Sequence, residues 1–124
     1  MYQTFQVTDR WTGEELHCLY QALIVAIATR HADAVDIKFS VNERSVWIAL
    51  PHPAWGEYHR RTGRVLNDPL AIQIAGRYLK YLIETGGYEH GRDMYTLTVD
   101  ETLEHLNTFL KEVGAPQDAL VTTA

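Results

Sequence analysis

The chain has 124 residues and a mass of 14.2 kDa, which is the size of one domain with a core of its own. Hydrophobic residues make up 46% and charged residues 22% of the sequence, an ordinary globular composition that argues against a disordered chain. With 11 Lys and Arg against 16 Asp and Glu, the net charge is −5, which makes nucleic acid an unlikely general partner.

Cysteine content and hydropathy further limit the class of protein. One cysteine is present, so an internal disulfide and a zinc site built from cysteines are excluded. Apolar runs stay well short of the roughly 20 residues of a membrane span, and the N-terminus lacks the pattern of a secretory signal. We therefore expect a cytoplasmic protein that does not act at a membrane.

The N-terminal half is predicted to begin with a strand and a helix. Phe5 and Val7 alternate with polar residues, which predicts a strand over residues 2–8. Thr12 and Glu15 match a capping box, which predicts a helix from residue 12 to about residue 31. Its core stripe at helical spacing would be Leu16, Leu19, Tyr20, Leu23 and Ile27.

Two further strands follow. Residues 34–41 alternate strictly, with Val35, Ile37, Phe39 and Val41 on one side, the strongest strand pattern in the chain. Residues 42–44 read as a turn and residues 45–50 as a second strand, so the pair is predicted to form a hairpin.

The C-terminal half is predicted to be mainly helical. Residues 52–62 form a short helix that Gly63 ends, and residues 69–85 form a longer helix after an Asn67 cap. Residues 93–98 form a strand. A second capping box at Thr98 and Glu101 starts the last helix, which ends at Gly114.

These elements predict an α+β fold of order β-α-β-β-α-α-β-α, with an antiparallel sheet of about four strands and helices packed on one face. The predicted domain covers residues 1–114, and residues 115–124 form a loosely ordered tail. The sequence lacks P-loop, dinucleotide-binding, HExxH and GxSxG motifs. Cys18 is expected to be a buried core residue, and no cofactor is expected.

The most distinctive segment lies between residues 55 and 64. Arginines with aromatic neighbours offer forked donors and a stacking face, which suit phosphate, carboxylate or a single-stranded base. The alternative is a solvated helix end in which Arg61 pairs with Glu57 one turn earlier. The candidate anion-binding residues are Trp55, Tyr58, His59, Arg60, Arg61 and Arg64.

Histidines provide a weaker candidate. His52 and His59 are seven residues apart on one predicted helix, so both can face one way. With His90 they would supply the three nitrogens of a metal site. Nothing in the sequence brings His90 close to the other two, so surface histidines are the favoured interpretation and no metal is expected.

Excess apolar surface motivates the leading functional hypothesis. The polar residues of the 69–85 helix occupy one narrow stripe, so its other faces need cover. We expect a non-enzymatic binding or interaction domain that acts as a homodimer, with Leu79 or Ile24 near the interface. The alternatives are an anion-binding or single-stranded nucleic-acid-binding module that uses residues 55–64, and a small enzyme that uses a histidine with a carboxylate.

Overall fold

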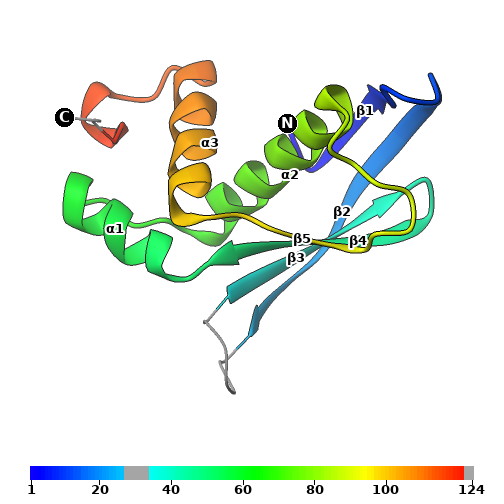
Figure 1. The fold of residues 1–124 in the computed structure, drawn as a ribbon. Coiled ribbons are helices and arrows are strands. Elements are labelled where there is room, and N and C mark those ends of the chain that lie inside the picture. Colours follow the sequence, from blue (N-terminus) through cyan, green and yellow to red (C-terminus); the bar gives the residue numbers. More distant parts are fainter. Residues whose placement is uncertain (27–33, 122–124) are drawn as a thin grey trace.

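Five strands form one sheet in the computed structural model, which describes residues 1–26 and 34–121 (Figure 1). The sheet follows chain order, and its first four strands are antiparallel neighbours. The fifth pairs in parallel with the fourth. The predicted α+β fold with an antiparallel sheet of about four strands is therefore confirmed in outline, and the sheet differs in having five strands with one parallel pair. The strands are β1 (Thr4–Thr8), β2 (Glu15–Ala26), β3 (Ala34–Val41), β4 (Arg44–Pro51) and β5 (Met94–Thr96).

Strand β2 replaces the helix that was predicted from residue 12. Leu16 and Cys18 point into the core as an alternating strand requires, but the pairing with β3 shifts between Tyr20 and Ala22. This bulge adds one residue, so the next inward side chain is Leu23 and the spacing from Tyr20 is three. A three-residue step mimics a helical stripe, which explains the wrong prediction. The remainder of that predicted helix, residues 27–31, lies outside the described residues.

The capping-box match at Thr12 has a different structural role. The Thr12 hydroxyl accepts from the backbone N–H of Glu14, two residues on, at 3.1 Å. The backbone N–H of Gly13 donates to the carbonyl of Asp9, and Gly13 has a φ of 74°. Residues 9–14 therefore form a tight loop between β1 and β2, a structure that Thr and Gly favour as strongly as a helix start.

The predicted hairpin and the three later helices are present. Asn42 and Glu43 both have positive φ, 47° and 71°, so β3 and β4 are joined by a two-residue turn of the type that matches sheet twist. The Asn67 side chain accepts from Leu70 N–H, and the Thr98–Glu101 capping box forms as predicted. The helices are α1 (Pro53–Thr62), α2 (Asp68–Thr85) and α3 (Val99–Glu112).

All three helices lie on one side of the sheet (Figure 1). Among the inward residues of β3 and β4, Ile37, Phe39 and Ile48 are 0% exposed. Ile74 and Leu79 of α2 are equally buried, so the core lies between the sheet and the helix layer. The predicted packing of the helices on one face of the sheet followed from the alternation in residues 34–41, where Asp36, Lys38 and Ser40 leave one side of the strand polar.

The chain ends are tied to the helices. Tyr2 is 8% exposed, and its hydroxyl donates to the Glu112 carboxylate. Near the other end, Gln117–Ala119 forms one turn of 3₁₀ helix, and Asn107 bonds both the N–H and the carbonyl of Val121. Residues up to 121 thus pack against the domain, and residues 122–124 of the predicted loose tail lie outside the described residues. Across the described ranges, no helix is long and apolar enough to cross a membrane.

Candidate functional site

The side of the sheet that faces away from the helices carries large side chains without cover from the described residues. Register places the outward residues of β2, β3, β4 and β5 side by side on this surface. Leu19 is 49%, Ile24 50% and Met94 44% exposed. We define the open face by six residues: Leu19, Ile24, Asp36, Lys38, Trp47 and Met94.

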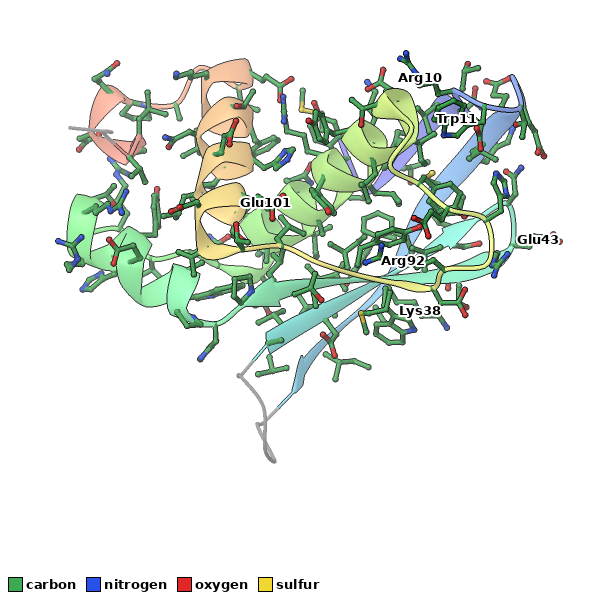
Figure 2. The ribbon with its side chains drawn as sticks, viewed as in Figure 1. Arg10, Trp11, Lys38, Glu43, Arg92 and Glu101 are labelled. Carbon is green, nitrogen blue, oxygen red and sulfur yellow. The ribbon has the colours of Figure 1, made fainter. Side chains whose placement is uncertain are left out.

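Two opposite charges occupy the centre of the open face. Asp36 and Lys38 are alternate residues of the middle strand β3, and Figure 2 shows Lys38 on the side of the sheet away from the helices. The Lys38 ammonium lies 6.0 Å from the centroid of the Trp47 ring. Burial raises the pKa of Asp36. Neither residue is in an ion pair with another described residue, so both charges are available to a partner.

Apolar residues flank this charged centre on both sides. Trp47 and Met94 are cross-strand neighbours on one side, and Leu19 and Ile24 lie on β2 on the other. A solvated sheet face normally alternates polar outward residues with apolar inward ones. Large apolar side chains exposed on an outer face are instead typical of an interaction surface.

The open face was missed by the sequence reasoning, although one signal was available. If Val46, Ile48 and Leu50 face the core, Trp47 must face outward. The contribution of β2 could not be found, because a predicted helix places Leu19 and Ile24 on different surfaces.

The arginines of the 55–64 segment all lie in ion pairs. Glu57 accepts hydrogen bonds from both Arg60 and Arg61, which lower its pKa to about 2. Arg64 pairs with Asp118 at 2.8 Å. The Arg61–Glu57 contact, at 2.6 Å, is the pairing that the solvated-helix interpretation requires.

The aromatic residues of that segment are dispersed. Tyr58 is 1% exposed, and its hydroxyl donates to the carbonyl of Ala119, so its ring belongs to the core. Trp55 is partly buried and packs against the ring of His52, while His59 is exposed at the end of α1. An anion-binding role for the segment stays a prediction, and it would require Arg60 and Arg61 to exchange Glu57 for the ligand.

The histidines lie in two different regions. His52 and His59 are at the two ends of α1, whereas His90 is in the loop between α2 and β5. Within residues 1–26 and 34–121, no group of three or more His, Cys, Asp or Glu side chains could hold a metal ion.

His90 instead forms a pair with a buried carboxylate. Its Nε2 lies 2.6 Å from an oxygen of Asp9, which is 2% exposed. Burial alone would raise the pKa of Asp9, but hydrogen bonds from His90 and from the N–H groups of Trp11 and Thr12 outweigh it and lower the pKa. A carboxylate that orients a histidine suits acid–base chemistry. In this fold the pair also joins the β1–β2 loop to the α2–β5 loop, and the enzyme alternative stays a prediction.

Cys18 is buried as predicted, although on a strand and not on a helix. It is 1% exposed, and burial raises the pKa of its thiol to about 12. Such a thiol is almost wholly protonated at neutral pH, so it is a poor nucleophile.

We therefore expect native Cys18 to react with a thiol reagent at least about 100-fold more slowly than in the urea-unfolded chain. Cys18→Ala should lower the free energy of unfolding by only about 1 kcal/mol, because the cavity is small. Labelling followed by absorbance tests the first statement and urea titration the second. Equal labelling rates in the two states would contradict the buried position of Cys18. A redox or nucleophilic role for this residue would then have to be considered again.

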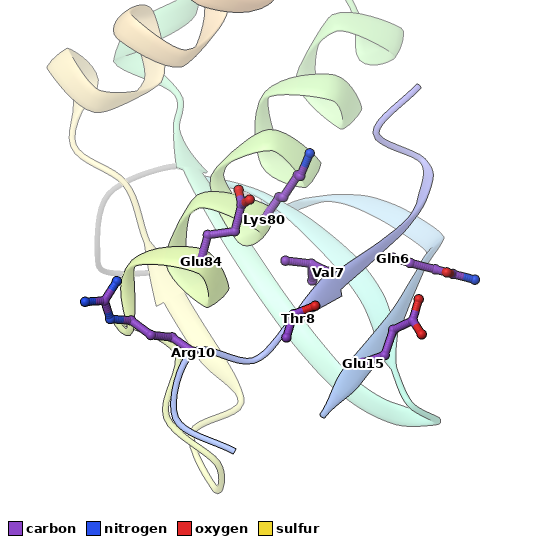
Figure 3. A pocket seen from close by; sticks show the side chains of 7 residues that line it. All are labelled: Gln6, Val7, Thr8, Arg10, Glu15, Lys80 and Glu84. Carbon is purple, nitrogen blue, oxygen red and sulfur yellow. The ribbon is translucent and has the colours of Figure 1, made fainter. Parts of the chain in front are cut away.

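A polar groove of about 430 Å³ lies along the outer edge of β1. Figure 3 shows Lys80 and Glu84 of α2 on one side of β1, with Gln6 and Glu15 on the other. Arg10 lies beyond the end of the strand. The residues that line the groove are Gln6, Val7, Thr8, Arg10, Glu15, Lys80 and Glu84.

Comparisons of the chain with protein-family models, with curated proteins and with solved structures find no match. The open face and the groove beside β1 are the two surfaces from which a function can be inferred.

Proposed function

We propose that this protein is a small interaction domain that forms a homodimer by stacking the open faces of two sheets. The observation that carries the proposal is the arrangement of Asp36 and Lys38 between two apolar flanks. A homodimer interface must be self-complementary. The open face meets this condition in one orientation.

The orientation follows from the charges. Consider a two-fold axis that lies between the two sheets and runs perpendicular to the strands, close to Ile37. It places the two β3 strands above one another in opposite directions. Each Asp36 then faces the Lys38 of the other copy. An axis parallel to the strands would place like charges opposite each other, which is unfavourable.

The same axis brings each apolar flank against the identical flank of the other copy. Trp47 and Met94 would lie against the β4–β5 flank of the other copy, and Leu19 and Ile24 against its β2 flank. Sheets pack face to face about 10 Å apart, a gap that these side chains can fill. With five strands about 4.8 Å apart, the face suits an interface of standard size, near 1,200–1,600 Å² in total.

The helix surface that first suggested a dimer does not support one. Leu79 is 0% exposed and belongs to the core cluster, as do Ile74 and Ile83. The apolar excess of α2 is therefore covered within the chain. Ile24, the other predicted interface residue, is half exposed on the open face.

Exchange of the two central charges tests the proposal. We expect the wild type to sediment at twice 14.2 kDa at high concentration and to dissociate in the micromolar range. Asp36→Lys should weaken the dimer at least about tenfold, because each new lysine would face Lys38 of the other copy. Adding Lys38→Asp should restore dimerisation, because the charges become complementary again.

Apolar substitutions provide a second arm with a matched control. Ile24→Glu and Trp47→Glu should each give a folded monomer, whereas Val65→Glu, at a 70% exposed apolar site outside the open face, should leave the dimer intact. Circular dichroism monitors the fold and analytical ultracentrifugation the mass. A wild type that stays monomeric at several hundred micromolar would contradict the proposal, and so would a double charge variant that fails to recover.

A further inference from the structure

A second binding surface lies at the free edge of the sheet. Strand β1 pairs with β2 on one side only, because it is the first strand in the sheet order. We infer that this edge, together with the groove beside it, binds an extended peptide as an antiparallel sixth strand. The peptide would carry a basic residue and, two positions later, an acidic residue on the side that faces α2.

Backbone geometry identifies which groups are available at the edge. Tyr20 N–H donates to the carbonyl of Gln3 at 2.7 Å, and Asp9 N–H donates to the carbonyl of Glu14 at 2.8 Å. Antiparallel pairing alternates bonded and non-bonded pairs. The odd-numbered residues of β1 therefore bond to β2, and the N–H and C=O groups of Thr4, Gln6 and Thr8 point outward.

The groove occupies the place that a sixth strand would take. It follows β1 along Gln6, Val7 and Thr8, and its lining includes residues from both sides of the strand. Backbone groups would provide the affinity, and the side chains that line the groove would select the sequence, as in other cases of strand addition.

The two charges on α2 define the sequence preference. Lys80 and Glu84 are one helical turn apart, about 6 Å along the axis. Alternate residues of an extended strand are about 6.7 Å apart on the same side. Two side chains of opposite charge on alternate residues of the peptide therefore match the pair on the helix. Neither Lys80 nor Glu84 forms an ion pair with another described residue.

The direction of the chain fixes the order of these charges. Strand β1 and helix α2 run in the same direction (Figure 1), so an antiparallel peptide passes Glu84 first and Lys80 second. Its basic residue must therefore precede its acidic one.

Two peptides of identical composition test the inference. The matching probe is Thr-Val-Lys-Thr-Glu-Val-Thr, in which Lys and Glu face the same side. The control is Thr-Val-Lys-Glu-Thr-Val-Thr, in which they face opposite sides. With both ends blocked, the matching peptide should bind about three- to tenfold more tightly, as two exposed ion pairs allow. In NMR titrations, the amide signals of Thr4, Gln6 and Thr8 should shift.

Two protein variants separate backbone recognition from side-chain recognition. Gln6→Pro removes one outward N–H but no bond to β2, a change that edge strands tolerate, and it should weaken binding at least about tenfold. Gln6→Ala keeps the N–H and removes only the side chain, so it should bind the peptide more tightly than Gln6→Pro does. Exchange of the helix charges, Lys80→Glu with Glu84→Lys, should reverse the preference toward a peptide with Glu before Lys.

The outcomes distinguish this inference from the homodimer. The peptide should bind equally well to the Ile24→Glu variant, so a failure of dimerisation through the open face leaves this test intact. Equal affinity for the two peptides would overturn the inference, as would unaltered binding by Gln6→Pro. Loss of self-association in Gln6→Pro would also overturn it, because a second copy would then occupy the edge.

Discussion

Gly76→Ala is expected to lower the free energy of unfolding by about 3 kcal/mol or more. A Cβ atom at Gly76 would lie 2.2 Å from the carbonyl oxygen of Tyr2 and 2.7 Å from its Cβ. The main chain of residue 2 would have to move, and the Tyr2 ring would leave its place beside Phe5 and Phe109. Loss of a buried aromatic side chain costs about this much. Urea titration measures the change.

Gly56→Ala is the matched control for this prediction. Gly56 also lies within a helix, but a Cβ there meets nothing within 4 Å. Alanine should therefore stabilise the protein by up to about 1 kcal/mol, through helix propensity. In a chain that lacks residues 1–3, Gly76→Ala should lose most of its cost. Equal costs in the full and shortened chains would contradict the assigned clash.

Leu79→Glu is expected to abolish folding. Leu79 is 0% exposed in the core, so glutamate would remove apolar contacts and bury a charge without a partner. Leucine truncation alone costs about 2–5 kcal/mol, and the buried carboxylate adds several more. The sum approaches the whole stability of a domain, about 5–15 kcal/mol. Loss of helical circular dichroism, or recovery only in insoluble form, is the expected result.

Tyr81→Glu is the matched control, because it introduces a glutamate on α2 only two positions after Leu79. Tyr81 is 51% exposed, and its ring meets the ring of His105 edge-on. The cost should therefore be about 1 kcal/mol. A folded Leu79→Glu protein that has merely become monomeric would contradict the buried position of Leu79 and restore α2 as a dimer surface.

Local signals in the sequence were sufficient for most elements. Cap residues and alternation are local properties, so α2, α3 and the β3–β4 hairpin could be predicted with nearly their observed bounds. The bulge in β2 could not, because an extra residue between Tyr20 and Ala22 leaves the apolar spacing compatible with both a strand and a helix. The parallel pairing of β5 was also hidden, since it joins segments about 50 residues apart and depends on the packing of α2 and α3.

The candidate site was harder to predict for the same reason. The six residues of the open face come from four strands, and sequence reasoning placed β2 in a helix. The arginine segment is prominent in sequence because its charges are contiguous. In the fold, Glu57 and Asp118 pair with those charges, and Asp118 lies 54 residues from Arg64. Partners at such a distance are not visible in a local pattern.

The sequential order of the sheet also determines when its core can close. Strands β1 to β4 pair with their nearest neighbours in the chain, and hairpins of this kind form early because their loops are short. The helices that cover the inner face, α2 and α3, end only at residues 85 and 112. During synthesis, the sheet therefore has two uncovered faces until α2 and α3 have been made, and the growing protein is most prone to aggregation in that interval.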